Sequence, residues 1–183
     1  MECKFLMRTV GEVDLSGYLK EIPDLIVVKD KTHNAYDTFQ MALSKAVGWG
    51  AVHLEDDIIL CNNFRNRIIE IIKEHPEDVI QFFSMRKDDL TIGTRYINGS
   101  KFLMGQCFYI PNRLATDLFI YSYNWKRRKE HPTGLDTMIS DFLKLNKINY
   151  LNIVPNLVDH QCVKSRIDPR RSTKRQSLTF KAE

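Results

Sequence analysis

Short runs of apolar and β-branched residues alternate along this chain with segments whose apolar residues recur every three or four positions. The first pattern is typical of buried strands and the second of amphipathic helices. Strands are predicted at 3–10, 25–28, 51–54, 79–84, 101–110 and 150–154. Helices are predicted at 15–22, 34–47, 63–75, 113–123 and 136–145. This alternation predicts an α/β domain with a mixed central sheet flanked by helices.

Three stretches depart from this alternation. Residues 85–99 are polar and without period, and we interpret them as a loop. The basic stretch 126–129 is interpreted as a solvated face. After Ile167 the chain turns to Arg, Lys, Ser and Thr with few apolar residues. We therefore predict a domain over 1–167 and a basic tail over 168–183, without order of its own or ordered only on binding.

The composition is that of an ordinary globular protein, with 183 residues, 43% of them apolar and 27% charged. It argues against disorder, collagen and a small disulfide-stapled fold. The four cysteines are widely spaced and form no C-x-x-C pair, so we expect reduced thiols in a cytoplasm. Glu2, Lys4 and Arg8 interrupt the first stretch, and no apolar run nears the roughly 20 residues of a membrane span. We therefore expect a soluble protein without a secretory leader.

The formal net charge of +4 arises at the end of the chain. Residues 164–183 hold seven of the 27 basic side chains and two of the 23 acidic ones, a balance of +5. The first 163 residues hold the other 20 basic and 21 acidic side chains, a balance of −1. Overall charge therefore does not mark the body as a binder of nucleic acid.

The strongest chemical feature is the triplet Glu55-Asp56-Asp57, which follows a predicted buried strand. Three adjacent carboxylates repel one another unless a cation offsets their charge. Mg²⁺ and Mn²⁺ prefer oxygen ligands and often bind carboxylates together with substrate phosphates. Ligands of open α/β sheets lie at the carboxyl ends of the strands. A metal site is therefore favoured over a solvated acidic turn.

Two later residues carry weaker indications. His160 follows the last predicted strand and could bind a metal or a phosphate, although a single histidine is more often structural. Asp136 opens a predicted helix, where the helix dipole stabilises its charge, and an N-cap role accounts for it fully.

Several motifs occur together in a recognisable order. They are Leu54-Glu55-Asp56-Asp57-Ile58, Asn63-Phe64, Gly105-Gln106-Cys107-Phe108-Tyr109-Ile110-Pro111, Gly134-Leu135-Asp136 and Pro155-Asn156-Leu157-Val158-Asp159-His160. In this order the chain resembles the small GT-A-fold glycosyltransferases of bacteria and phages, of the lipopolysaccharide and procollagen galactosyltransferase type. The resemblance runs from about residue 3 to 167.

The resemblance implies a single Rossmann-like domain that binds a nucleotide sugar, with a UDP-sugar as donor and Mn²⁺ or Mg²⁺ as cofactor. It implies that Asp57 and His160 bind the metal and that Glu55 and Asp56 contact the nucleotide ribose or the ion. Which of the two neighbours of Asp57 does which is left open.

The resemblance also assigns residues to the acceptor and to the nucleoside. Asp136 falls where an acidic side chain faces the acceptor and, in an inverting enzyme, serves as general base. Arg8 and Asp30 fall where the nucleotide base and ribose are held. One departure lies two residues after the late histidine, because Cys162 stands where relatives commonly have glycine.

The leading hypothesis is a metal-dependent glycosyltransferase of a bacterial or phage-infected cytoplasm. Its acceptor would be a hydroxyl of a glycan, a protein or a modified DNA base, and an anionic acceptor, DNA or an acidic glycan, would suit the basic tail. One alternative is a non-enzymatic nucleic-acid-binding protein that uses the tail. A weaker one is a metal-dependent phosphohydrolase, against which the absence of a second dense carboxylate and histidine cluster counts.

Overall fold

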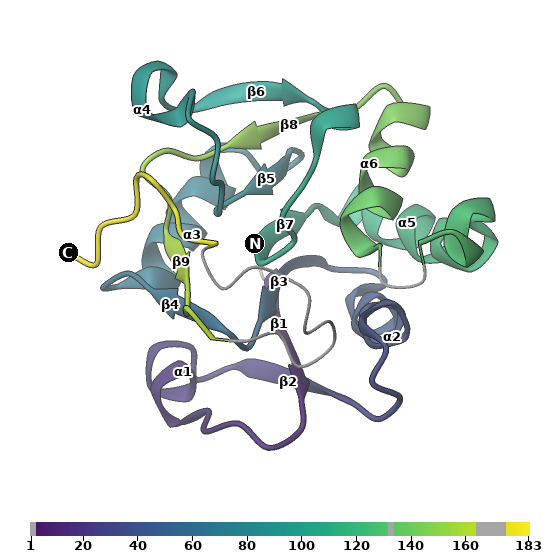
Figure 1. Cartoon of the computed structure of the whole chain (residues 1–183), viewed down its shortest axis with the longest axis horizontal. Helices are drawn as coiled ribbons and strands as arrows, with labels where there is room; N and C mark the ends of the chain where they lie inside the picture. Colours follow the sequence, from purple (N-terminus) through teal and green to yellow (C-terminus); the bar gives the residue numbers. More distant parts are fainter. Residues whose placement is uncertain (1–2, 132–133, 164–174) are drawn as a thin grey trace.

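Seven of the nine strands form one central sheet in the computed structural model, which describes residues 3–131, 134–163 and 175–183 (Figure 1). The strands are β1 (Cys3–Val10), β2 (Leu25–Asp30), β3 (Gly50–Glu55), β4 (Ile58–Leu60), β5 (Val79–Gln81), β6 (Arg95–Asn98), β7 (Cys107–Ile110), β8 (Asn149–Asn152) and β9 (Val158–His160). The helices are α1 (Ser16–Glu21), α2 (Ala35–Ala46), α3 (Phe64–Glu74), α4 (Asp89–Ile92), α5 (Asn112–Asn124) and α6 (Leu135–Leu145). Two 3₁₀ turns, η1 (Gly99–Lys101) and η2 (Lys126–Lys129), complete the described elements.

The sheet is mixed, in the order β2-β1-β3-β7-β5-β8-β6. β1 pairs in parallel with β2 and β3, and β5 pairs in parallel with β8, whereas β7 and β6 run against their neighbours. The five parallel-running strands therefore end at one edge of the sheet. The predicted α/β class, with a mixed sheet flanked by helices, is confirmed.

Helices cover both faces of the sheet because the buried strands present apolar side chains on each side. On one face, α2, α5 and α6 lie side by side (Figure 1) and pack around Phe39, Phe108 and Leu118. Asn34 starts α2 as predicted, since its side chain accepts hydrogen bonds from the backbone N–H groups of Tyr36 and Asp37.

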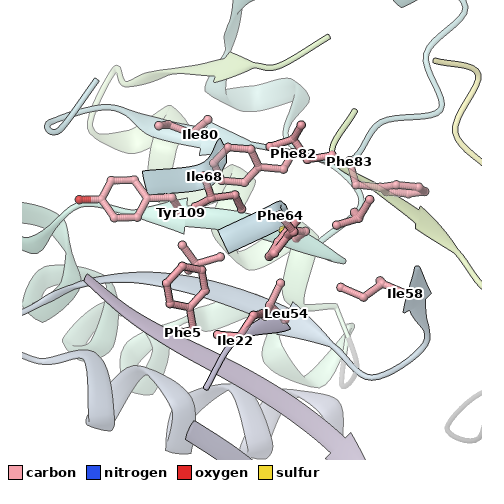
Figure 2. Packing of buried hydrophobic residues seen from close by; sticks show 14 of the residues in the cluster. Phe5, Ile22, Leu54, Ile58, Phe64, Ile68, Ile80, Phe82, Phe83 and Tyr109 are labelled. Carbon is pink, nitrogen blue, oxygen red and sulfur yellow. The ribbon is translucent and has the colours of Figure 1, made fainter. Parts of the chain in front are cut away.

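The opposite face is packed by α1, α3 and the β4 strand. Phe5 and Leu54 of the sheet meet Phe64 and Ile68 of α3 there (Figure 2). The aromatic residues Phe82 and Phe83, and also Phe108 and Tyr109, are all buried.

Two regions differ from the sequence prediction. The stretch 85–99 is not a loop throughout, because it contains α4 and the edge strand β6, which pairs with β8. An edge strand has one solvated side, so β6 has the polar composition that suggested a loop. The predicted strand over 101–110 is shorter, and only β7 within it pairs in the sheet.

The predicted basic tail over 168–183 is described in part, and that part contains no helix or strand. Part of that tail, 168–174, lies outside the described residues. The rest packs against the body: Phe180 lies against the core, and Ser177 N–H donates to Asp159 Oδ1 at 2.7 Å. The Asn62 N–H donates to the carbonyl oxygen of Ala182 at 2.9 Å. Backbone hydrogen bonds and the Phe180 side chain thus hold this segment against the body.

All four cysteines lie among the described residues and are free thiols, as expected. None of the helices in the described ranges is long and apolar enough to cross a membrane.

Candidate functional site

The three carboxylates of the predicted metal triplet point to three different partners where β3 turns into β4. Glu55 lies 3.5 Å from the guanidinium of Arg8. Asp56 Oδ2 accepts a hydrogen bond from the backbone N–H of Val10 at 3.1 Å. Asp57 Oδ2 lies 3.0 Å from His160 Nε2. The mutual repulsion of the triplet is therefore relieved by three separate contacts.

The contact between Asp57 and His160 depends on a strand pair that the sequence did not predict. β4 and β9 form a small antiparallel sheet in which Ile58 is opposite His160. The backbone N–H of Gln161 also donates to the Asp57 carbonyl oxygen at 2.7 Å. This pairing places the imidazole of His160, which is fully buried, against the carboxylate.

A third charge approaches Asp57 from the end of the chain. Arg175 Nη2 lies 3.8 Å from Asp57 Oδ2, and the Arg175 side chain is largely buried. Burial by itself raises the pKa of the Asp57 carboxyl, but the hydrogen bond and charge of His160, with the charge of Arg175, hold that pKa below its usual value. Asp57 is therefore ionised at neutral pH.

The pair formed by Asp57 and His160 has free capacity for a ligand. Asp57 Oδ1 and His160 Nδ1 are buried and have no hydrogen-bond partner among the described residues. The facing groups, Asp57 Oδ2 and His160 Nε2 at 3.0 Å, are a carboxylate oxygen and an imidazole nitrogen, two ligand types that a divalent transition metal accepts. In the described ranges no group of three or more His, Cys, Asp or Glu side chains could enclose a metal. A cation here would take its remaining ligands from substrate or water.

The predicted nucleoside residues lie at the same edge of the sheet. Arg8 is 6% exposed, and its Nη2 donates to the Gly105 carbonyl oxygen at 2.8 Å. Asp30 ends β2, and its Oδ1 accepts from the Thr32 N–H at 2.8 Å. Buried polar atoms without a hydrogen-bond partner among the described residues gather here: Arg8 Nε, Thr9 Oγ1, Asp30 Oδ2 and Gln106 Oε1. Unpaired buried polar atoms are costly and often mark ligand sites.

Asp136 has a definite structural task. Its Oδ2 accepts from the Met104 N–H at 2.8 Å and its Oδ1 from the Gly105 N–H at 2.9 Å. A Cβ at position 105 would lie 2.7 Å from Asp136 Oδ1, so the close approach requires glycine. Met104 has a positive φ of 69°, which the two hydrogen bonds help to hold. Through Gly105, Asp136 is linked to Arg8.

The basic stretch 126–129 forms the η2 turn, which contacts the start of α2 through Arg128 and Asp37. Arg127 lies 3.0 Å from Asp141, and Arg128 forms an ion pair with Asp37. Two of its four charges are therefore neutralised within the fold.

A shallow surface pocket of about 400 Å³ lies between α1 and the start of α3. Glu21, Asp24, Asn63 and Arg65 are among its lining residues, and no predicted site residue lines it.

Sequence analysis missed three residues that surround Asp57: Tyr18, Gln161 and Arg175. Tyr18 lies in α1, far from the triplet in sequence, and nothing in its neighbourhood indicated a role. Gln161 follows the predicted ligand His160 directly, which was the only available hint. Arg175 was considered only as part of a basic tail that would contact the acceptor.

Comparison with protein-family models finds no match, and neither does comparison with curated proteins. Solved structures do resemble the fold. One is described as a glucose-1-phosphate thymidylyltransferase from Bacillus anthracis in complex with sucrose. Its TM-score is 0.55 and its sequence identity 11%, and the match covers 87% of this chain and 89% of that chain. Another is the CTP:phosphocholine cytidylyltransferase of Streptococcus pneumoniae, with a TM-score of 0.52 and 12% identity over 87% and 93%. The chain therefore has the Rossmann-like fold seen in nucleotidyltransferases.

Proposed function

We propose that this protein is a metal-dependent glycosyltransferase that moves a sugar from a nucleotide-sugar donor to a hydroxyl acceptor. The observation that carries the proposal is the contact of Asp57 with His160 at the carboxyl edge of the parallel strands. Ligands of open α/β sheets bind at this edge. The likeness to two nucleotidyltransferases supports a nucleotide as the ligand bound there.

Asp57 and His160 are the proposed metal ligands, because each has a buried donor atom without a described hydrogen-bond partner. Mn²⁺ suits this pair better than Mg²⁺, since Mg²⁺ is usually bound by oxygen alone. A bound divalent cation would stabilise the negative charge that develops on the departing diphosphate. Arg175 adds a fixed positive charge beside the same carboxylate.

The nucleoside of a UDP-sugar is proposed to bind beside Arg8 and Asp30, where the unpaired polar atoms gather. Glu55 and Asp56 border this region, and we propose that they contact the ribose. The Glu55 carboxylate also holds the Arg8 guanidinium in place.

Asp136 is the proposed general base. An ionised carboxylate can take the proton of an acceptor hydroxyl as the new glycosidic bond forms. Each of its oxygens already accepts one backbone N–H, which fixes the carboxylate rigidly and leaves a further lone pair on each oxygen. A glycan, a protein or a hydroxylated DNA base remains the proposed acceptor.

A second candidate is nucleotidyl transfer from a nucleoside triphosphate, which the similarity to the two transferases favours. Triphosphates are commonly held by the backbone N–H groups of a glycine-rich loop after a strand. In this chain the segment after β1 has one glycine, Gly11, followed by the acidic Glu12 and Asp14. Their charge opposes a triphosphate, and we therefore rank this candidate second.

The reaction products separate the two candidates. The full chain is incubated with Mn²⁺ and UDP-hexoses, and release of UDP is measured. In parallel it is incubated with nucleoside triphosphates and hexose 1-phosphates, and release of pyrophosphate is measured. Metal-dependent UDP release supports the glycosyltransferase, and pyrophosphate release supports the nucleotidyltransferase. If no nucleotide with Mn²⁺ raises the melting temperature and neither product forms, both proposals fail.

A further inference from the structure

Two side chains from opposite ends of the chain hold the turn that presents Asp57. Tyr18 Oη donates to the Ile58 carbonyl oxygen and lies 3.1 Å from that of Asp56. Gln161 Nε2 donates to Tyr18 Oη at 3.2 Å and to the Ile58 carbonyl oxygen at 3.1 Å. The backbone N–H of Gln161 donates to the carbonyl oxygen of Asp57, the residue between Asp56 and Ile58.

Three consecutive carbonyl oxygens, at positions 56, 57 and 58, are thus held by only two residues. Nothing in regular secondary structure requires this, because the turn between β3 and β4 could leave these groups to water. Tyr18 is only 8% exposed and comes from α1, which packs beside the turn. Burial, with the charges of Asp56 and Asp57, raises the pKa of Tyr18 to about 12, so its hydroxyl keeps its proton at neutral pH.

We propose that Tyr18 and Gln161 are positioning residues that fix the Asp57 carboxylate for cation binding. The inference rests on the proposed function, in which Asp57 is a metal ligand. Their hydrogen bonds go to the backbone on both sides of Asp57, so they set the direction of its side chain without touching the cation. Outer groups that orient metal ligands typically change metal affinity 10- to 100-fold when they are removed.

The test compares the variants Tyr18→Phe and Gln161→Met with the wild type. Each keeps the size of the side chain and removes the hydrogen-bonding groups. Tyr109→Phe is the matched control, because Tyr109 is also buried and its hydroxyl donates to a backbone carbonyl, that of Pro76 at 3.1 Å. Tyr109 lies against Gly50, at the opposite end of β3 from Glu55.

Two readouts are taken on the full chain without nucleotide. Mn²⁺ affinity is measured from the electron paramagnetic resonance signal of free Mn²⁺. Hydrogen exchange of the Gln161 backbone N–H reports how firmly the turn is held, since this group is bonded to the Asp57 carbonyl oxygen.

We expect Tyr18→Phe and Gln161→Met each to weaken Mn²⁺ binding about tenfold. We expect exchange at Gln161 to be about tenfold faster in Tyr18→Phe, which corresponds to the loss of one net hydrogen bond. The double variant should lose little more Mn²⁺ affinity than the stronger single variant does, because both substitutions act on one hydrogen-bond network. Tyr109→Phe should leave both readouts unchanged.

Equal behaviour of Tyr18→Phe and Tyr109→Phe in both readouts would overturn the inference. A wild type that binds no Mn²⁺ either alone or together with UDP would instead overturn the proposed function. In that case Gln161 exchange still decides whether Tyr18 fixes the turn, so the two failures are distinguishable.

Discussion

The carboxylate of Asp57 and the imidazole of His160 lie 3.0 Å apart, although the two residues are 103 positions apart in the sequence. Their meeting depends on the pairing of β4 with β9, two strands of three residues each. Because so short a pair is weak by itself, the side chains around it matter for keeping Asp57 in place. The candidate site is therefore a product of the packing around this small sheet.

Asp57→Asn should abolish the metal-dependent effect of nucleotide on stability. The amide removes the negative charge that attracts the cation while keeping the size of the side chain. In a thermal-shift experiment, UDP with Mn²⁺ should raise the melting temperature of the wild type and have no effect on the variant. Asp117→Asn, an exposed position on α5, is the charge-matched control and should behave as the wild type. An undiminished shift in Asp57→Asn would remove Asp57 from the metal site.

Arg175→Gln should tighten the binding of Mn²⁺ to the free protein and weaken the binding of nucleotide. In the free protein Arg175 competes with a cation for Asp57, so its removal should tighten Mn²⁺ binding several-fold. With UDP bound, the lost positive charge near the diphosphate should weaken nucleotide binding several-fold. Isothermal titration with Mn²⁺ alone, and then with UDP and Mn²⁺, measures both effects. Lys181→Gln makes the same charge change in an exposed position of the same segment, and an equal response there would argue against a specific role.

Asp136→Asn should separate acid–base chemistry from positioning. An asparagine can accept one of the two backbone N–H bonds but cannot take a proton from an acceptor. We expect nucleotide affinity to change less than about threefold while transfer falls at least about 100-fold. Asp141→Asn, on the same helix, should keep full transfer. If Asp136→Asn instead weakens nucleotide binding and keeps the rate of transfer at saturating nucleotide, Asp136 acts only by holding Met104 and Gly105.

His53 should make the protein less stable in mild acid. Burial, with the nearby charge of Arg8, lowers the pKa of this fully buried histidine to about 3. Its pKa in the unfolded chain is about 6.5. As the pH falls below that value, His53 binds a proton in the unfolded chain but stays neutral in the native state. The free energy of unfolding therefore decreases.

The variant His53→Leu removes this effect. Between pH 7 and pH 5 the wild type should lose about 2 kcal/mol more of its free energy of unfolding than the variant does. Urea denaturation at the two pH values measures the difference. Parallel pH profiles would mean that His53 is protonated in the native state. The ring stacks on Phe108 with centroids 5.1 Å apart, an environment that favours the neutral form.

Local sequence patterns predicted most of the fold because its main elements satisfy local rules. Asn34 caps α2 directly. In the helix predicted over 63–75, Phe64, Ile68 and Ile72 are buried, and Ile71 is partly buried. β6 was missed because an edge strand needs no apolar pattern. β9 was missed because three residues are too few to show a period.

The sequence by itself determined the α/β class, the mixed sheet and the placement of a carboxylate triplet at a strand end. Only the tertiary structure decided which carboxylate meets which partner, because that depends on contacts between residues far apart in the chain. Asp57 meets His160 through a paired strand, and Tyr18 reaches the same turn from α1. Arg175 reaches it because Ser177 and Phe180 anchor the end of the chain to the body. No local pattern encodes such contacts, since the partners become neighbours only once the core has packed.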